Sequence, residues 1–359
     1  MRVFHVISGF ENGGVETLLL RLISKMPSDV EHHIVAHETP VPACAERFRD
    51  AGVSVHTVPS RKHLFSHLRA LRALFCAVRP DVVHVHTTEW GILALWAAKK
   101  EGVPCRIQHS HAARREKNPV VRIAQAVLFA LARRTATDYF ACGTDAARAA
   151  FGAGASRAKI LKNGIDVSEF SFDADRRRVT REALGLGQEQ AVVGMVARFS
   201  PQKNHERAIE LFAAYHQKNP GAVLLLVGDG ALRAKVEAQA QKMLPEGAVH
   251  FLGVRTDMAA LYAAMDIFML PSRFEGLPIT LVEAQTCGLP SVVADTVTRE
   301  ADLSGIVSFV DTANTAAWVS AMERAGVRER GNYPARVEAA GYSITESAKA
   351  LVEFYRSKI

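Results

Sequence analysis

The chain has 359 residues, of which 48% are hydrophobic and 23% are charged, and its formal net charge is +7. This length fits two domains of about 150–200 residues, and the composition excludes a disordered chain. No apolar run reaches the roughly 18–20 residues that span a bilayer. The five cysteines are scattered without C-x-x-C pairs, which favours reduced thiols in the cytosol over a metal site.

Short β-rich runs alternate with amphipathic segments through the first half of the chain. Helical spacing covers 16–25, 64–79 and 120–134, and the predicted strands are 2–7, 32–37, 53–58, 82–86, 106–109 and 138–142. Alternation of strands and helices on this scale predicts an α/β fold with a doubly wound parallel sheet. Because the first strand starts at once, the N-terminus is not expected to be a signal peptide.

The second half repeats this scheme after a short strand at 159–161. Its predicted strands are 191–196, 222–227, 249–252, 266–270, 291–294 and 306–309, with helices at 206–217, 231–243 and 257–264. Turn residues at Asn163-Gly164-Ile165-Asp166 predict a boundary between a first domain of residues 1–166 and a second of residues 167–343. The last segment, about 344–359, again has helical spacing.

A glycine-containing loop, Ser8-Gly9-Phe10-Glu11-Asn12-Gly13-Gly14, follows the first strand. Paired glycines allow close approach of a sugar or phosphate and expose N–H groups at a helix start. The spacing of Gly9, Gly13 and Gly14 does not fit G-x-G-x-x-G, which argues against a dinucleotide-dependent dehydrogenase.

Two histidines bracket a serine in Gln108-His109-Ser110-His111, at the carboxyl end of a predicted strand. Ligands of open parallel sheets bind beyond such strand ends, so both histidines are candidates for a reaction centre. Lone histidines are more often structural. His84 and His86, which lie on a predicted strand, are interpreted in that way.

Two cations follow the strand 191–196. Arg198 lies just beyond its end and Lys203 opens the next helix, within Arg198-Phe199-Ser200-Pro201-Gln202-Lys203-Asn204-His205. A cation pair beside a helix N-terminus suits a diphosphate whose negative charge grows as a bond to it breaks. The alternative is that both are solvated cations on a surface loop.

Two carboxylates, Glu275 and Glu283, stand eight residues apart in the segment 271–290, after the strand 266–270. Pro278 suits a first helical turn, and Gly288 with Pro290 ends the helix. Glu275 is therefore expected beside free backbone N–H groups, with Glu283 about two turns along the same helix. Such a pair can hold a polyhydroxylated, phosphorylated ligand.

Together these segments resemble the family-4 retaining glycosyltransferases of the GT-B fold, whose signature is Glu-x7-Glu. The resemblance implies two Rossmann-like domains facing a central cleft, with the C-terminal helix crossing back onto the first domain. It is greatest for bacterial enzymes of capsular, exopolysaccharide or lipopolysaccharide synthesis. One departure concerns sugar specificity, because Gly276-Leu277-Pro278 follows Glu275 where many members have Gly-Phe-Gly.

The resemblance also assigns roles to residues. It gives Glu275 the hydroxyls of the donor sugar, Glu283 the ribose, and His111, or alternatively His109, a place near the sugar's 6-hydroxyl. The expected catalytic residues are His111, His109, Glu275, Arg198 and Lys203. The expected donor and nucleotide site comprises Gly13, Gly14, Arg198, Lys203, Gly228, Val254, Arg255, Glu275, Gly276, Leu277, Pro278 and Glu283, with main-chain groups of Val254 or Arg255 facing the base.

The expected reaction is retaining, front-face transfer from a nucleoside diphosphate sugar, with UDP favoured as the nucleotide, to a glycan or lipid-linked acceptor. Neither a cofactor nor a metal is expected. Two rivals remain: a sugar-nucleotide epimerase of the same fold, and an inactive nucleotide-sugar-binding partner subunit.

Charge is distributed unevenly along the chain. Residues 1–180 hold 26 Lys/Arg against 17 Asp/Glu, an excess of 9, whereas residues 181–359 hold 18 against 20. A basic first half, with local clusters at 61–62, 114–117 and 133–134, is expected to dock weakly on an anionic membrane surface from the cytoplasm. Nucleic acid is not expected as a partner, because the clusters lack interleaved aromatic residues.

Overall fold

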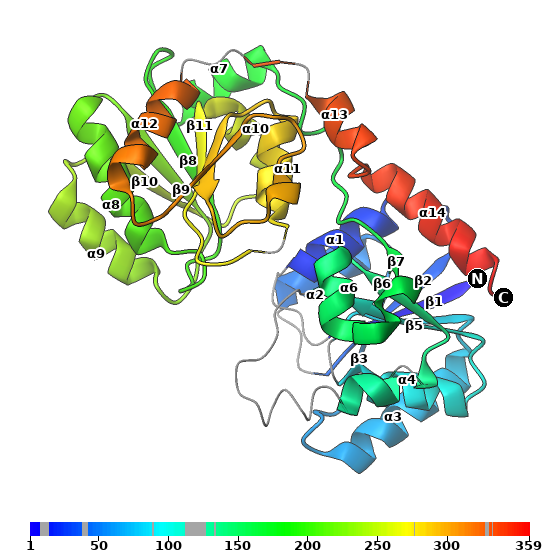
Figure 1. The fold of residues 1–359 in the computed structure, drawn as a ribbon. Coiled ribbons are helices and arrows are strands. Elements are labelled where there is room, and N and C mark those ends of the chain that lie inside the picture. The colour runs from blue at the N-terminus through cyan, green and yellow to red at the C-terminus, as the bar shows by residue number, and fades with distance from the viewer. Residues whose placement is uncertain are drawn as a thin grey trace. The chain divides into compact units, whose positions relative to one another are not determined.

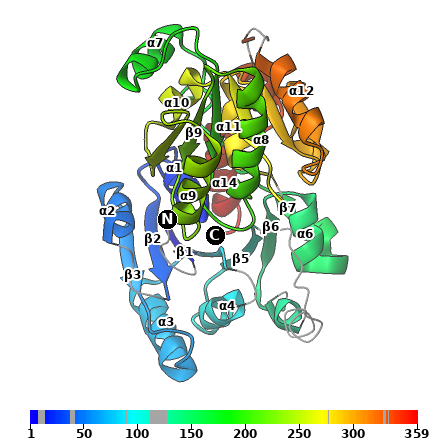
Figure 2. The ribbon, with the colours of Figure 1, turned by 90° about the vertical axis from the view of Figure 1, so that its left-hand side faces the viewer.

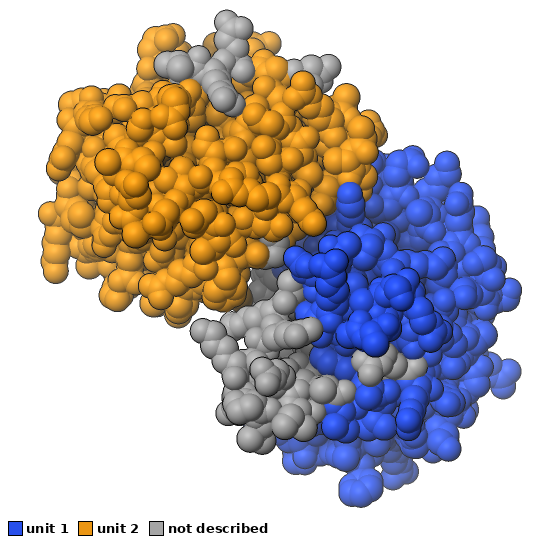
Figure 3. All heavy atoms as spheres, viewed as in Figure 1, with its two compact units in different colours: residues 1–164, 343–359 blue, residues 165–342 orange. Residues whose placement is uncertain are grey.

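The computed structural model describes residues 1–7, 14–37, 42–87, 90–111, 127–132, 134–275, 277–326, 330–331 and 333–359. The chain forms two compact units (Figures 1 and 3). Unit 1 contains residues 1–164 and 343–359, and unit 2 contains residues 165–342.

Unit 1 is built on a parallel sheet of seven strands in the order β3-β2-β1-β4-β5-β6-β7. The strands are β1 (Arg2–Val6), β2 (Glu31–Ala36), β3 (Ser54–Thr57), β4 (Val82–Val85), β5 (Cys105–Ser110), β6 (Asp138–Ala141) and β7 (Lys159–Ile160). The strand order reverses between β1 and β4. In doubly wound sheets this is the place where ligands bind, beyond the carboxyl ends of the strands.

Helices cover both faces of this sheet, as doubly buried parallel strands require. They are α1 (Gly14–Ile23), α2 (Pro42–Asp50), α3 (Leu64–Val78), α4 (Gly91–Lys100), α6 (Thr144–Phe151) and α14 (Ile344–Arg356). Apolar residues of α1 and α14 pack with Val82 and Ile107 on one face, and those of α3 and α4 pack with Val83 and Val85 on the other (Figure 2). The final helix of the chain thus completes the core of unit 1.

Unit 2 has a parallel sheet of six strands in the order β10-β9-β8-β11-β12-β13. These are β8 (Val192–Val196), β9 (Val223–Val227), β10 (Val249–Gly253), β11 (Ile267–Leu270), β12 (Ser291–Ala294) and β13 (Val307–Val310). Its helices are α7 (Ala174–Ala183), α8 (His205–Lys218), α9 (Arg233–Met243), α10 (Met258–Ala264), α11 (Ile279–Thr286), α12 (Thr315–Gly326) and α13 (Pro334–Ala339). Here the order reverses between β8 and β11.

A buried ion pair fixes α7 to unit 2. Arg181 is fully buried, and its Nη2 donates to Oδ2 of Asp266 at 2.7 Å. Arg177 donates to the other carboxylate oxygen at 2.6 Å, and the backbone N–H of Val192 donates to Oδ2 at 2.8 Å. Burial lowers the pKa of Arg181, while Asp266 opposes that shift. The carboxylate is therefore compensated by two guanidinium groups and one backbone N–H.

The predicted fold class is confirmed, and the predicted strands are present with only small differences at their ends. The predicted helix at 120–134 falls largely on residues outside those described. The sequence did not predict α2, α4, α6, α7, α12 or α13. The sequence of α7 is rich in charge and lacks the apolar periodicity that predicts a helix. Its buried residue is an arginine, Arg181, instead of an apolar side chain.

Candidate functional site

The ends of β8 and β11 in unit 2 bring a lysine and a glutamate together. Nζ of Lys203 lies 2.6 Å from Oε1 of Glu275, and these side chains are 20% and 6% exposed. Nε2 of Gln202 donates to the carbonyl of Phe274 at 3.0 Å and to Oε2 of Glu275 at 3.3 Å. In return, the backbone N–H of Arg273 donates to the carbonyl of Gln202 at 2.8 Å. Gln202, which the sequence did not single out, thus links the two loops and hydrogen-bonds to the carboxylate of Glu275.

Arg198 lies on the same connection after β8, with an exposed side chain. The backbone on either side of it is fixed, since Ala197 N–H donates to Val227 and Phe199 N–H donates to Asp229, at 3.0 and 2.9 Å. Within the described parts of the chain, the guanidinium makes no salt bridge or side-chain hydrogen bond. The neighbouring backbone is therefore fixed, while the side chain of Arg198 is exposed.

The turn after β9 approaches this connection so closely that it requires glycine. Gly228 has φ +130°, and a Cβ there would lie 2.3 Å from the carbonyl oxygen of Ala197. Gly230 has φ +154°, and a Cβ there would lie 2.6 Å from the carbonyl oxygen of Phe199. Both positions combine the backbone region that favours glycine with contact to main-chain atoms. A side chain at either glycine would therefore collide with the main chain of the connection after β8.

The second carboxylate is held within unit 2 by a tyrosine that the sequence did not single out. Glu283 lies on α11 and is 4% exposed, and Tyr262 Oη of α10 donates to its Oε2 at 2.9 Å. The helix begins at Ile279, so Pro278 is its N-cap with extended backbone, one residue before the predicted first turn. Leu277 is half-buried against the core. Gly276 lies outside the described residues.

The predicted base-binding edge follows β10. Val254 is 73% exposed, and Arg255 is held in a two-pronged ion pair with Asp257, at 2.8 and 2.6 Å. The hydrogen bond and charge of Asp257 raise the pKa of Arg255. Because its side chain is engaged by Asp257, any contact of this segment with a base would fall to main-chain groups.

The residues predicted in unit 1 are described separately. Gly14 opens α1 and is exposed, whereas Gly13 lies outside the described residues. His109 is 1% exposed on β5, and His111 follows that strand and is half-buried. Their ring centroids are 4.0 Å apart, and burial lowers the pKa of His111 to about 4. Both rings hydrogen-bond to histidines of β4 or its end: His109 Nδ1 lies 3.1 Å from His84 Nε2, and His111 Nε2 lies 2.9 Å from His86 Nδ1.

The chain contains an Asp-x-Asp triplet, the motif of metal-dependent sugar transferases, at Asp173-Ala174-Asp175. Asp173 is the N-cap of α7, and its side chain accepts from the backbone N–H of Arg176 at 2.9 Å. The side chain of Asp175 is 92% exposed and lies 3.7 Å from Arg178. This triplet starts a helix and gives no support to a metal site.

Comparison with known proteins identifies the family. The model "Glycosyl transferases group 1" matches residues 176–304, and "Glycosyltransferase Family 4" matches residues 12–169. A Bacillus subtilis protein named "Putative glycosyltransferase EpsF" is 32% identical over 99% of this chain and 96% of its own length. The chain belongs to the family-4 glycosyltransferases.

Other relatives and solved structures agree with this assignment. The "UDP-Gal:alpha-D-GlcNAc-diphosphoundecaprenol alpha-1,3-galactosyltransferase" of Escherichia coli is 28% identical over 65% of this chain and 63% of its own. The structure of Anabaena HepE with UDP and glucose superposes with a TM-score of 0.82 at 19% identity, covering 99% of this chain and 100% of HepE. The glycosyltransferase WaaG, involved in lipopolysaccharide biosynthesis, gives 0.70 at 18% identity, with 98% and 99% covered. These structures show the GT-B fold.

None of the helices in the described part of this glycosyltransferase combines the length and apolar character that a bilayer crossing needs.

Proposed function

We propose that this glycosyltransferase is a retaining, metal-independent enzyme of bacterial surface polysaccharide synthesis. It takes the sugar from a nucleoside diphosphate sugar, with UDP favoured as the nucleotide, and passes it to a glycan or lipid-linked acceptor. The observation that carries the proposal is the contact of 2.6 Å between Lys203 and Glu275, with the exposed cation Arg198 on the same connection after β8 as Lys203.

The two cations suit the leaving diphosphate. Arg198 offers a planar fork to two phosphate oxygens, and Lys203 supplies a mobile point charge. Both follow β8, where ligands of open parallel sheets bind. Since negative charge on the diphosphate grows as the glycosidic bond breaks, positive groups aimed at it lower the barrier.

The two carboxylates suit the remainder of the donor. Glu275, steadied by Lys203 and Gln202, presents acceptor oxygens for sugar hydroxyls. Glu283, held by Tyr262, is assigned to the ribose. In the sequence of residues 1–166 no carboxylate stands out as a nucleophile for the opposite sugar face, which favours front-face transfer. In this scheme a diphosphate oxygen takes the acceptor proton, and His111, or alternatively His109, lies near the sugar.

The choice of nucleotide rests on the relatives. The Escherichia coli relative is named for UDP-galactose, and HepE was solved with UDP. A "GDP-mannose-dependent alpha-mannosyltransferase" of Mycobacterium tuberculosis is also similar, at 31% identity over 70% of this chain. Main-chain recognition beside Arg255 is compatible with either base, so UDP is the hypothesis for the first experiment.

A thermal-shift panel of nucleoside diphosphates and their sugars tests the proposal. A ligand at about 100 times its dissociation constant should raise the free energy of unfolding by roughly 2.7 kcal/mol. We expect UDP and a UDP-sugar to stabilise the protein and GDP, ADP and CDP to have little effect. Stabilisation by GDP alone would overturn the choice of base, and stabilisation by none of them would overturn the donor site.

Two further assays separate the rival functions. Pure protein incubated with the donor alone should give no isomer, whereas an isomerised sugar would indicate an epimerase. A stabilising donor that is never transferred to any of a panel of lipid-linked acceptors would indicate a binding subunit.

Docking on anionic membrane is tested by sedimentation with anionic and neutral vesicles at two salt concentrations. Of the three basic clusters, residues 114–117 and Arg133 lie outside the described part of the chain. We expect binding to the anionic vesicles alone, and only at low salt. Equal binding to both vesicle types would contradict the proposal.

A further inference from the structure

Six histidines gather on one face of the sheet of unit 1. They come from neighbouring strands or from the residue after a strand: His32 from β2, His5 from β1, His84 and His86 from β4, and His109 and His111 from β5. His5 is in register with His84, and the pairs on β4 and β5 are each two residues apart, so their side chains point the same way. All are buried except His111, which is half-buried.

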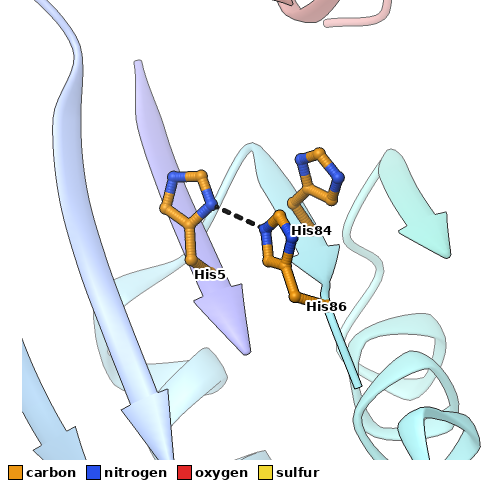
Figure 4. Close-up of side chains that lie close together, drawn as sticks. All are labelled: His5, His84 and His86. Carbon is orange, nitrogen blue, oxygen red and sulfur yellow. Dashed lines mark hydrogen bonds between the residues drawn. The ribbon is translucent and has the colours of Figure 1, made fainter. Parts of the chain in front are cut away.

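Four of these rings form a hydrogen-bonded row. Nδ1 of His32 lies 3.3 Å from Nε2 of His5, and Nδ1 of His5 lies 3.2 Å from Nε2 of His86. Nδ1 of His86 lies 2.9 Å from Nε2 of His111. Every link therefore joins Nδ1 of one ring to Nε2 of the next, and Figure 4 shows the central link edge to edge. We call His32, His5, His86 and His111 the histidine row.

A metal ion is the competing interpretation of this cluster. Two sets of three histidines each bring one ring nitrogen per residue within 4.8 Å of the others. The first set is His5, His84 and His86, and the second is His86, His109 and His111. A shared ion needs lone pairs that converge on one point about 2.0–2.1 Å away. The rings of His84 and His86 are instead stacked, with centroids 4.2 Å apart and planes 24° apart. Lone pairs lie in the ring planes, so these two do not converge.

Hydrogen bonding imposes a condition on the row. A neutral imidazole has one N–H and one lone pair, so a ring that donates at Nδ1 must accept at Nε2. Burial and neighbouring histidines lower the pKa of His5 and His86 well below the ordinary value, which keeps these rings neutral near pH 7. If all three links are hydrogen bonds, all four rings must carry the proton on the same nitrogen. The proton position on one ring then dictates that on the others.

The row ends at the half-buried His111, whose Nδ1 is itself buried and has no hydrogen-bond partner among the described residues. When all rings are protonated at Nδ1, Nδ1 of His111 is a donor, and in the alternative state it is an acceptor. We propose that His5 and His86 are positioning residues that set, through the histidine row, which nitrogen of His111 carries the proton. For its consequence in sugar transfer this inference rests on the proposed function, which assigns His111 to the reaction centre.

Nitrogen-15 NMR of the imidazoles tests the coupling directly, because it distinguishes Nδ1–H, Nε2–H and charged rings. In the wild type, all four rings of the histidine row should show the same tautomer. His5→Phe keeps an aromatic ring at this position and removes both links of His5, so His111 should shift toward a mixture of tautomers. If His5→Phe does not fold, His32→Phe removes only the end link and should shift His111 in the same direction.

The matched control is His33→Phe. His33 lies on β2 next to His32, and its Nδ1 hydrogen-bonds to Nε2 of His56 at 3.0 Å, while its ring stacks on Phe4. The control removes a comparable histidine–histidine bond from the same sheet but lies outside the row. It should leave the signals of His111 unchanged.

Three results would overturn the inference: mixed tautomers along the row in the wild type, unchanged His111 signals in the folded His5→Phe or His32→Phe variant, or stoichiometric Zn²⁺ binding that is lost in His5→Phe. The last result would make these rings metal ligands.

The transfer assay then connects the row to catalysis. His86→Phe should lower kcat by about tenfold or more, the usual cost of losing a group that fixes a functional histidine, with KM for the donor little changed. An unchanged kcat despite a shifted His111 tautomer would remove His111 from the reaction centre. Absence of donor binding would count against the proposed function alone and would leave the NMR result standing.

Discussion

The two units share a doubly wound sheet but bury polar groups in different ways. Beside the strand reversal of unit 1, between β1 and β4, the buried polar groups include His5, His84 and His86, whose pKa values are lowered. Beside the reversal of unit 2, between β8 and β11, the polar groups are charged and paired: buried Arg181 contacts half-buried Asp266, and half-buried Lys203 contacts Glu275.

One architecture can therefore offset the cost of burying polar groups by two routes. An isolated buried charge is very unfavourable, so it must be neutralised or paired. Imidazoles become neutral by releasing a proton, which leaves them sensitive to acid. Ion pairs keep their charges and depend on each partner. The two units should therefore differ in what destabilises them.

Acid should destabilise unit 1 strongly, because several of its histidines are buried. Burial lowers the pKa of His32 and His111 from 6.5 to about 4 and that of His37 to about 3. Because these folded values lie below those of unfolded histidine, the unfolded chain binds more protons below pH 6.5. Each of these histidines therefore makes its full contribution to the free energy of unfolding above pH 6.5. That contribution falls by about 1.4 kcal/mol per pH unit as the pH drops toward 4.

Hydrogen exchange between pH 8 and pH 5, corrected for the intrinsic exchange rate, measures this effect in each unit. Protection should fall first in β1, β4 and β5. Unit 2 also contains a buried histidine, His205, whose pKa burial lowers to about 4, so its protection should fall less steeply than that of unit 1. Loss of protection in both units at the same pH would contradict the comparison.

The next effect concerns the ion pair of α7. Arg181→Met should destabilise unit 2 by about 3 kcal/mol, the low end of the cost of removing one partner of a buried pair, because Arg177 still contacts Asp266. Urea denaturation gives the change. Arg178→Met is the control: its side chain is 54% exposed, and we expect a loss of about 0.5 kcal/mol or less. Equal losses in the two variants would show that α7 is not anchored by Arg181.

In the proposed donor site, Arg198→Ala and Lys203→Ala should each lower the transfer rate on the order of 10²–10³, with little change in folding. Lys235→Ala removes a cation of the same unit whose Nζ contacts Glu206 at the surface, and it should transfer normally. Near wild-type turnover in both site variants would remove the diphosphate assignment.

The smallest effects are changes in ligand affinity, which should differ between variants of Glu275 and Glu283. Glu283→Ala should weaken both the nucleoside diphosphate and its sugar, whereas Glu275→Gln should weaken only the sugar nucleotide, by about 1.5–3 kcal/mol each. Tyr262→Phe removes the bond that orients Glu283 and should cost about 0.5–1.5 kcal/mol in both ligands. Calorimetry measures these affinities. Identical losses for both ligands in both carboxylate variants would mean that the glutamates only support the loop.

A structural feature could be predicted from the sequence where residues close together in the chain determine it. Continuous apolar runs such as Ile267–Leu270 locate the strands, because strands buried on both faces need them. The sequence places Lys203 and Glu275 after the ends of two strands. Their contact could not be predicted, because it depends on the pairing of β8 with β11. Tyr262 could not be found, since nothing in its neighbourhood signals a partner 21 residues away. The histidine row likewise depends on the register of three separate strand pairs.

Helix α14 has a consequence for synthesis of the chain. The ribosome completes residues 165–342 before it reaches residues 343–359, yet α14 buries Leu351 and Tyr355 in the core of unit 1. Oη of Tyr355 also hydrogen-bonds Nδ1 of His84 at 2.6 Å. During translation, the first 164 residues therefore wait with one face of their sheet incompletely covered while unit 2 can already fold. A segment synthesised after unit 2 thus completes the core of a domain whose other residues precede unit 2.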